Sequence, residues 1–460
     1  MRFLFTTLQF QETEFYGRVG ALLSARGHDV AHVCFSRRGT ATLRNRGERA
    51  WCLPDEMAKL GKIDVDAEAR RIEENYALPS LRAVYRIDWP CAGKPEAWCI
   101  ERTVRHFMAL ERIFDETAPD VVVPEVGNET MRQATHRIGV ARGIPVLFLF
   151  YTLFPNPLRL YVDTLHAPIA DPDRLPELHS DRRQEVEDFI ARFTARAKPI
   201  RDYRVSRVTP STLGAFARHV AVSSTVDRDN DYLRPARFVT QWARLTATAR
   251  LARLLYEPVR FERPFVYFPL HVTDDYKIKG VIPHCEDQAS LVEQVSDALP
   301  PGYDLVLKEH PMSIGRNGLG MLRRLVKREN VRLVEPWTSS HELIRASAGV
   351  AVIGSTVGPE ALLYARPVLT LGQPFYSGFG VTLDVDSFRE ITEKVPALLQ
   401  FRPDRERILR FLAAAMDACY PGVPGNVDPS DANAATLATS LESAGAREIS
   451  SRAPVPAPSS

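Results

Sequence analysis

The stretch "GVAVIGSTVGPEALLYARPVLTLG", from Gly349 to Gly372, decides the fold of the second half of this chain. Its first five residues are small or apolar, and such a short run is typical of a buried strand. The turn "GSTVGPE" then opens a helix, where Pro359 fits because the first N–H groups of a helix have no partner within it. A second apolar run, "PVLTLG", follows at once. The order strand, helix, strand predicts a parallel sheet with helices on both faces.

The same alternation recurs along the whole chain. In the first half we expect strands at 1–7, 29–35, 121–123 and 144–150, and a helix at 130–142. In the second half we expect strands at 265–270, 303–307 and 331–334, and helices near 288–299 and 319–328. The sequence therefore predicts an α/β protein with two Rossmann-like, doubly wound domains that face a cleft.

The length and the composition of the chain set the expected domain limits. A chain of 460 residues exceeds one compact core, so we expect two main domains, at 1–255 and 256–419. From Tyr420 onward the chain is rich in Pro, Ser and Ala and poor in large apolar side chains. Such segments bury too little apolar surface to fold, so we expect 420–460 to be a flexible, disordered tail.

Composition excludes several classes of protein. The formal net charge is only +2, which gives no argument for nucleic-acid binding. The six cysteines are scattered without zinc-site spacing, and the phosphate-binding patterns GxGxxG and GxxxxGK[ST] are absent, so we expect no metal and no cofactor. The N-terminus lacks the apolar stretch of a signal peptide, and no run reaches the ~20 apolar residues of a membrane span, so we expect a cytoplasmic protein.

Polar side chains gather where the strands of the second half end, which is where ligands bind in sheets of this kind. The first group is "KEHP", namely Lys308, Glu309, His310 and Pro311. Pro311 removes a backbone donor and pushes His310 toward an extended conformation, so the chain leaves the sheet at this point. We expect the three ionisable side chains to converge on a ligand, the alternative being a charged, solvated strand end.

The second group is the turn at Gly354, Ser355 and Thr356. Two hydroxyls and the free N–H groups of a helix start favour an anion such as a phosphate, and the small residues allow it to approach the backbone. A plain N-cap is the alternative. A capping box would need Glu or Gln three residues after the hydroxyl, but Glu360 is out of frame with Thr356. We therefore expect Glu360 to be free for a ligand hydroxyl, such as that of a ribose.

Carboxylates also follow two expected strands of the first half. Glu125 lies in "PEVGNE" and Glu14 lies in "FQETE". Either one could face the cleft and act as a general base or as a nucleophile, and the sequence leaves that choice open.

Taken together, these motifs resemble the bacterial capsule polysaccharide biosynthesis family, which includes β-Kdo transferases. The resemblance rests on "FVYFPLH", "LPPGYDLVLKEHP" and "STVGPEALLYARPVLTLGQPFYSGFGVT", and in the first half on "PDVVVPEVGNETMRQATHRIGVARGIPVLFL" and "PLRLYVD". It implies a GT-B glycosyltransferase fold whose C-terminal domain holds a nucleotide-sugar donor. The stretch 272–284 departs from the family pattern, which leaves the identity of the sugar open.

The resemblance also implies roles for single residues. His310 and Pro311 would contact the CMP part of a CMP-Kdo donor, Ser355 and Thr356 the phosphate, and Glu360 the ribose. The implied activity is metal-independent transfer of a Kdo-like sugar to a lipid or glycan acceptor in capsule polysaccharide biosynthesis and transport. The alternatives are a GT-B enzyme with a UDP- or CDP-linked donor and a non-catalytic partner of capsule assembly or export. A peripheral contact with the inner membrane or the assembly machinery stays open.

Overall fold

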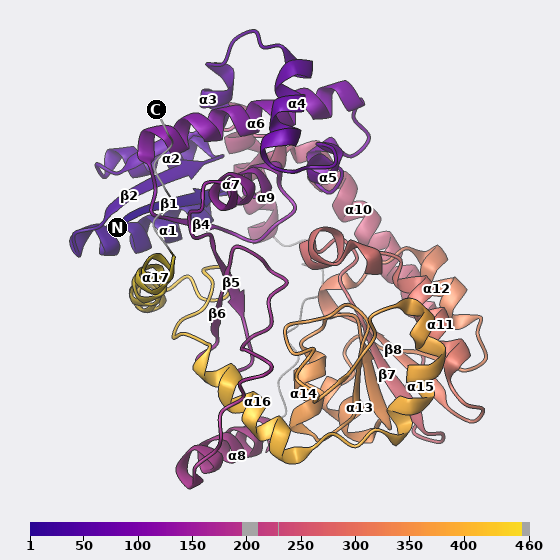
Figure 1. The fold of residues 1–460 in the computed structure, drawn as a ribbon. Coiled ribbons are helices and arrows are strands. Elements are labelled where there is room, and N and C mark those ends of the chain that lie inside the picture. The colour runs from indigo at the N-terminus through magenta and orange to yellow at the C-terminus, as the bar shows by residue number, and fades with distance from the viewer. Residues whose placement is uncertain (196–209, 229, 453–460) are drawn as a thin grey trace.

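The computed structural model describes residues 1–195, 210–228 and 230–452. It contains two α/β halves, each built on a parallel sheet, with the long helix α10 (Pro235–Ala252) passing from one half to the other (Figure 1). This arrangement confirms the expected fold class. The first sheet and its helices lie at 2–162 and the second at 265–400. We propose that the boundary between the domains falls near residue 255.

The first sheet has the strand order β3-β2-β1-β4, with every neighbouring pair parallel. Its strands are β1 (Arg2–Thr7), β2 (Asp29–Cys34), β3 (Arg49–Cys52) and β4 (Val121–Pro124). A hairpin of β5 (Leu147–Tyr151) and β6 (Leu158–Val162) joins it through a parallel bridge between Val122 and Val146. Its helices are α1 (Phe10–Ala25), α2 (Arg37–Asn45), α3 (Leu53–Ala58), α4 (Val65–Asn75), α5 (Arg82–Tyr85), α6 (Glu96–Thr117) and α7 (Thr130–Ala141).

The second sheet has the order β12-β11-β10-β7-β8-β9 and is parallel throughout. Its strands are β7 (Phe265–Leu270), β8 (Asp304–Glu309), β9 (Val331–Val334), β10 (Gly349–Val352), β11 (Val368–Thr370) and β12 (Leu383–Asp384). Its helices are α11 (Gln288–Ala298), α12 (Leu319–Val326), α13 (Ser340–Ala346), α14 (Val357–Leu363) and α15 (Ile391–Gln400). The central strands β7 and β10 are buried along their whole length, which explains their unbroken apolar runs.

Three helices connect or flank the two halves: α8 (Ser180–Ala195), α9 (Pro210–Thr225) and α16 (Arg405–Asp417). Helix α16 packs against α8, with Arg182 of α8 paired to Asp417 and Arg183 paired to Glu406 at 2.7 Å. The chain therefore comes back from the second sheet along the first half of the molecule (Figure 1).

The prediction of a disordered tail from Tyr420 is wrong for most of that segment. Residues 431–451 form a helix, α17 (Asp431–Ser451), which packs against α1 beside the first sheet (Figure 1). Its buried face is a narrow stripe of Ala and Leu that includes Leu437 and Leu441. The small alanines of this stripe let α17 approach α1 closely. Ser430 caps the helix by accepting a hydrogen bond from the N–H of Asn433 at 3.2 Å. Residues 453–460 of the expected tail lie outside the described residues.

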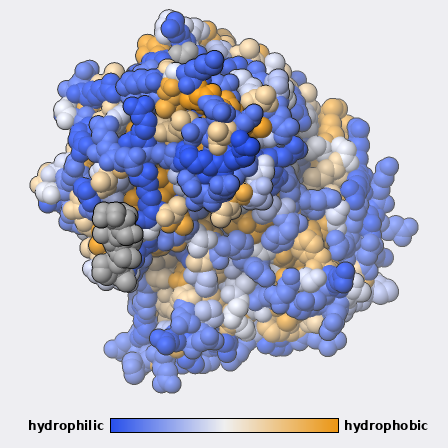
Figure 2. All heavy atoms as spheres, turned by 45° about the horizontal axis from the view of Figure 1, so that its top comes forward, coloured by the Kyte–Doolittle hydropathy of each residue, from blue (hydrophilic) through white to orange (hydrophobic). Residues whose placement is uncertain are grey.

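The surface is mostly hydrophilic. On the face drawn in Figure 2, hydrophobic residues reach the surface in scattered groups that are surrounded by polar ones. Within the described ranges, no helix has the length and apolar character needed to cross a membrane.

Candidate functional site

Three adjacent strands of the second sheet end at one edge, and their final loops carry the candidate side chains. The order β10-β7-β8 places the loop after β7 between the other two. His271 follows β7, His310 follows β8, and the turn 354–356 follows β10. The carboxyl ends of parallel strands are where such sheets bind ligands. The topology therefore places the "KEHP" and "GST" groups at the same edge of the sheet, with the loop after β7 between them.

His271 and Lys277 hold the turn after β10 from two sides. The backbone N–H of Gly354 donates to Nε2 of His271 at 3.2 Å, and Nζ of Lys277 donates to the carbonyl oxygen of Gly354. A Cβ on Gly354 would lie 3.2 Å from Cε of Lys277, so this position favours glycine. The turn is thus fixed by side chains from the neighbouring loop.

The electrostatic environment of these two side chains is set by burial. Burial lowers the pKa of His271 to about 3, with the neighbouring Lys277 and His310 acting in the same direction. His271 is therefore neutral at physiological pH and can accept the N–H of Gly354. Burial lowers the pKa of Lys277 to about 8, and Asp275 opposes this effect. Lys277 is therefore a desolvated cation beside the turn, which is a favourable place for an anion.

Ser355 and Thr356 differ in their freedom to meet a ligand. Oγ of Ser355 accepts from the N–H of Val357 at 3.2 Å, and its carbonyl oxygen accepts from the hydroxyl of Tyr376 at 2.6 Å. Thr356 is exposed at the start of α14, and its side chain caps no N–H of the helix. The hydroxyl of Thr356 is the more accessible of the two.

Glu360 is less accessible to a ligand than the sequence predicted. It is only 8% exposed, within the first turn of α14, and its negative charge acts on Lys308. Its carboxylate therefore forms part of the local charge balance beneath the strand ends.

Lys308 and Glu309 do not converge on one ligand, so that part of the prediction is wrong. Nζ of Lys308 donates to Oγ of Ser340 at 2.6 Å and to the carbonyl oxygen of Thr338 at 3.0 Å. Glu309 is fully buried and accepts from Asn317 at 2.6 Å and from the hydroxyl of Tyr256. Both belong to β8, and consecutive residues of a strand point to opposite faces. Burial lowers the pKa of Lys308 to about 8 and raises the pKa of Glu309.

His310 is the exposed member of its group. Its Nδ1 accepts from the N–H of Met312 at 3.1 Å, which caps the short helical turn that begins at Pro311. Burial of part of the ring lowers the pKa of His310, and the charge of Lys308 lowers it further. The ring is therefore neutral at physiological pH.

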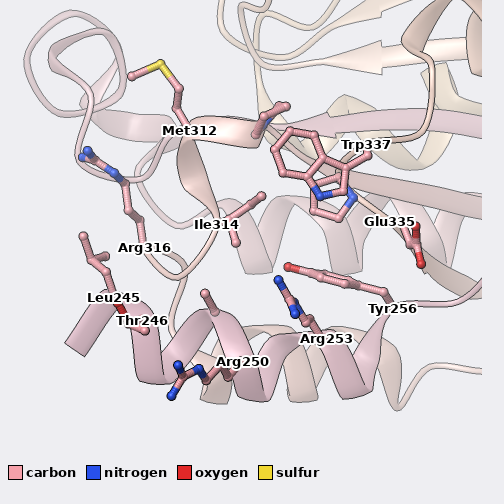
Figure 3. A pocket seen from close by; sticks show the side chains of 13 residues that line it. Leu245, Thr246, Arg250, Arg253, Tyr256, Met312, Ile314, Arg316, Glu335 and Trp337 are labelled. Carbon is pink, nitrogen blue, oxygen red and sulfur yellow. The ribbon is translucent and has the colours of Figure 1, made fainter. Parts of the chain in front are cut away.

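A cavity of about 830 Å³ lies directly beside Pro311. It is enclosed by α10, the loop after β8 and the loop after β9. Figure 3 shows the rings of Trp337 and Tyr256 along one side, with Arg253 beside Tyr256 and Ile314 facing them. Flat rings next to a guanidinium form a wall suited to a planar, charged ligand.

In the first half, Glu125 has the properties of a catalytic acid or base. It follows β4 and accepts a hydrogen bond from the hydroxyl of Tyr16. Burial, together with the charge of Glu12 and against the opposing charge of Arg132, raises the pKa of Glu125 to about 7. A carboxyl group with a pKa near neutrality can exchange a proton under working conditions.

The structure separates Glu14 from Glu125. Glu14 lies on α1 and pairs with Arg46 at 2.8 Å on the surface. Tyr16, which is two residues further along α1, faces Glu125 instead, and residues two apart on a helix do not share a face. Glu12 caps α1 by accepting the N–H of Gln9 at 3.2 Å, it also accepts the N–H of Leu8 at 2.7 Å, and it pairs with Arg132. Of these carboxylates, only Glu125 is left as a candidate.

The two halves meet between the end of β4 and the segment that follows β7. Nδ2 of Asn128 donates to the carbonyl oxygen of Asp274 at 2.9 Å, and Arg86 pairs with Glu286 at 3.2 Å. Nζ of Lys277 lies 5.8 Å from the ring centre of Phe150, at the end of β5. A cavity of about 620 Å³ opens at this junction, so the expected cleft between the domains is present. In the described part of the chain, no three His, Cys, Asp or Glu side chains form a metal-ligand set.

Sequence reasoning missed His271 and Lys277. His271 ends the motif "FVYFPLH", so its position at a strand end was a usable signal. Lys277 reaches the turn from within a π-helical segment, Lys277–Val281, and no local pattern predicts that approach.

Comparisons with known proteins agree with these motifs. Residues 175–408 match a family model described as capsule polysaccharide biosynthesis protein. The chain is 27% identical to Protein FixF of Sinorhizobium fredii over 206 residues, which are 44% of this chain and 50% of FixF. It is 31% identical to the capsule polysaccharide modification protein LipA of Neisseria meningitidis serogroup A over 116 residues, 25% of this chain and 16% of LipA. The chain thus spans half or less of these relatives.

A solved structure of KpsC from Thermosulfurimonas dismutans, titled beta Kdo 2,7 transferase, aligns with 69% of this chain and 87% of that one. The identity is 17% and the TM-score is 0.34.

Proposed function

We propose a function for this chain from the premise that it belongs to the capsule polysaccharide biosynthesis protein family. In this proposal the protein is a glycosyltransferase that moves a sugar from a nucleotide-activated donor to a glycan or glycolipid acceptor. The donor is a CMP-activated, Kdo-like sugar, as the sequence motifs imply.

The observation that carries the proposal is the cluster of His271, Lys277 and the turn 354–356 at adjacent strand ends. The hydroxyl of Thr356 and the cation of Lys277 can bind the donor phosphate together. Departure of the nucleotide leaves negative charge on that phosphate, and a fixed positive charge stabilises it as it develops. The proposed transfer is therefore metal-independent.

The nucleoside part of the donor occupies the cavity beside Pro311 in this proposal. The rings of Trp337 and Tyr256 can pack against a base, and Arg253 can contact a polar edge of it. His310 follows β8 and directly precedes Pro311, which lines the cavity, so it would contact the nucleotide between base and phosphate.

Glu125 activates the acceptor in this account. With a pKa of about 7, its carboxylate can take the proton of an acceptor hydroxyl as a general base. The alternative role, attack on the anomeric carbon as a nucleophile, requires the same ionised form.

Release of nucleotide from activated donors tests this proposal. The purified protein is incubated with CMP-Kdo, a UDP-sugar or CDP-glycerol, together with a panel of glycan and glycolipid acceptors, and free nucleotide and products are quantified. Acceptor-dependent release of CMP from CMP-Kdo, lost in Glu125→Gln, supports the proposal. Release of nucleotide from the UDP- or CDP-linked donor alone would mean that the donor is that compound and not CMP-Kdo. Nucleotide binding without transfer to any acceptor would favour the non-catalytic partner.

A further inference from the structure

Two neighbouring cavities lie along the N-terminal half of α10. The cavity of about 620 Å³ at the domain junction and a second cavity of about 790 Å³ in the first half share three lining residues: Trp89, Arg237 and Gln241. Because these residues line both cavities, the two spaces adjoin. We call this combined space the α10 groove. It begins near Asp274 and extends past α9 to Phe10 at the start of α1.

The α10 groove is rich in cations that have no acidic partner. Its walls include the guanidinium groups of Arg38, Arg218, Arg237 and Arg244 and the ammonium group of Lys279. Within residues 1–195, 210–228 and 230–452, none of these five side chains forms an ion pair. These charges are therefore available to a ligand.

The acidic side chains of the groove are already engaged. Asp274 pairs with Arg316 at 2.8 Å. Asp227 accepts from Oγ of Ser36 at 2.9 Å and from the N–H of Arg37 at 2.5 Å, at the start of α2. The net character of the groove is consequently positive.

Aromatic rings lie between these cations. The guanidinium of Arg237 lies 4.1 Å from the ring centre of Trp89, and that of Arg38 lies 3.7 Å from the ring centre of Phe10. The side chain of Phe238, at the rim, is 53% exposed. A guanidinium held over a ring keeps its edge free for a carboxylate or a phosphate, and flat rings pack well against sugar rings.

We propose that the α10 groove binds an extended anionic glycan, a chain of sugars bearing carboxylates or phosphates, as the acceptor of the reaction. This inference rests on the proposed transferase function, because it names the acceptor class. The arginines bind the acidic groups in this account, and Trp89 and Phe10 support the rings between them.

The position of the groove agrees with this role. One end opens at the domain junction, where Asn128 lines it three residues after Glu125. A glycan in the groove would therefore direct its end toward the candidate base. The unpaired charges lie inside a concave space between helices, which fits a single chain better than the flat surface of a bilayer. With a net charge of only +2, the protein also lacks the broad basic surface typical of nucleic-acid binding.

Calorimetric titration with defined oligosaccharides tests the inference. The probes are tetragalacturonate, with a carboxylate on every ring, and neutral maltotetraose. The test variant is Arg237→Ala/Arg244→Ala. The control is Arg70→Ala/Arg112→Ala, which removes two exposed arginines of α4 and α6 that also lack ion pairs in the described part of the chain. CMP is titrated into every variant in parallel.

We expect the wild type to bind tetragalacturonate and not maltotetraose. The test variant should bind it at least about tenfold more weakly, and the control within about twofold of wild type. Three results overturn the groove proposal. The test variant binds tetragalacturonate as tightly as wild type does, or wild type binds maltotetraose as tightly as tetragalacturonate, or wild type does not bind tetragalacturonate. Binding of an oligothymidylate and of anionic vesicles is measured as well. If the test variant no longer binds either of these but still binds tetragalacturonate, the groove proposal is also overturned. Failure of the donor assignment is distinguishable, since it appears as absent CMP binding in all variants.

Discussion

The backbone N–H of Gly354 donates a hydrogen bond to Nε2 of His271 at 3.2 Å, and this bond joins the ends of β10 and β7. The contact fixes the turn that we propose as the phosphate site. It also requires a neutral imidazole, and burial provides one by lowering the pKa of His271 to about 3. The two residues are 83 positions apart in the sequence.

The first prediction concerns His271→Ala. Loss of the acceptor leaves the N–H of Gly354 without its partner, so the turn loosens and CMP affinity should fall about tenfold. The matched control is His284→Ala, which removes an exposed histidine of the same segment. Calorimetry with both variants measures the effect. Equal CMP affinity in His271→Ala and wild type would rule out a role of this bond in donor binding.

The second prediction concerns the pH dependence of donor binding. Lys277 has a pKa of about 8, so its cation is present below that pH and is lost as the pH rises through it. CMP affinity should therefore decrease from about pH 7 to about pH 9. Lys277→Met should bind weakly throughout and lose this dependence.

Lys308→Met provides the control for that experiment. Burial also lowers the pKa of Lys308 to about 8, but its ammonium group is bonded to Ser340 and Thr338. The pH dependence should therefore persist in Lys308→Met. If it disappears there and persists in Lys277→Met, the phosphate contact has been assigned to the wrong lysine.

The third prediction concerns Glu125. Because the reactive form is the carboxylate and the pKa is about 7, turnover should rise with pH and level off above that value. Glu125→Gln should reduce kcat by roughly 10²–10⁴ with little change in donor affinity. The hydrogen bond from Tyr16 lowers the pKa of Glu125, so Tyr16→Phe should move the rise in kcat to higher pH. A pH profile that Tyr16→Phe leaves unchanged would contradict the assignment.

The fourth prediction concerns the stability supplied by α17. Leu441 is fully buried between α17 and the first sheet, whereas the side chain of Leu254 is 83% exposed. Leu441→Ala should lower the free energy of unfolding by about 2–5 kcal/mol, through lost burial and the cavity left behind. Leu254→Ala should change it by less than about 0.5 kcal/mol. Denaturant unfolding measures both, and similar small changes would mean that α17 contributes little.

The sequence predicted the strands well because central parallel strands are buried on both faces. The runs at 265–270 and 349–353 are unbroken and apolar, and each coincides with a strand. The short edge strands β3 and β12 were not predicted, since they have only four and two residues and are only partly buried. Helix α17 was not predicted because most of its buried residues are small (Ala, Ser or Gly), and composition alone does not distinguish such a helix from a disordered segment.

The candidate site was predictable only in part. Strand ends identified His310 and the turn 354–356, since topology alone brings such ends together. The directions of Lys308 and Glu309 follow from strand alternation, but which face each occupies depends on partners such as Ser340 and Tyr256, which lie elsewhere in the chain. Contacts of this long-range kind are not encoded in any local pattern.

The central claim is that the strand ends of the second domain bind the nucleotide of a sugar donor. Calorimetric titration of CMP, UDP and GDP into wild type and into Thr356→Ala/His310→Ala tests it most directly. The account predicts preferential binding of CMP, weakened at least about tenfold in the double variant while its melting temperature is retained. Undiminished CMP affinity in the folded double variant, or no binding of any of the three nucleotides by wild type, would contradict it.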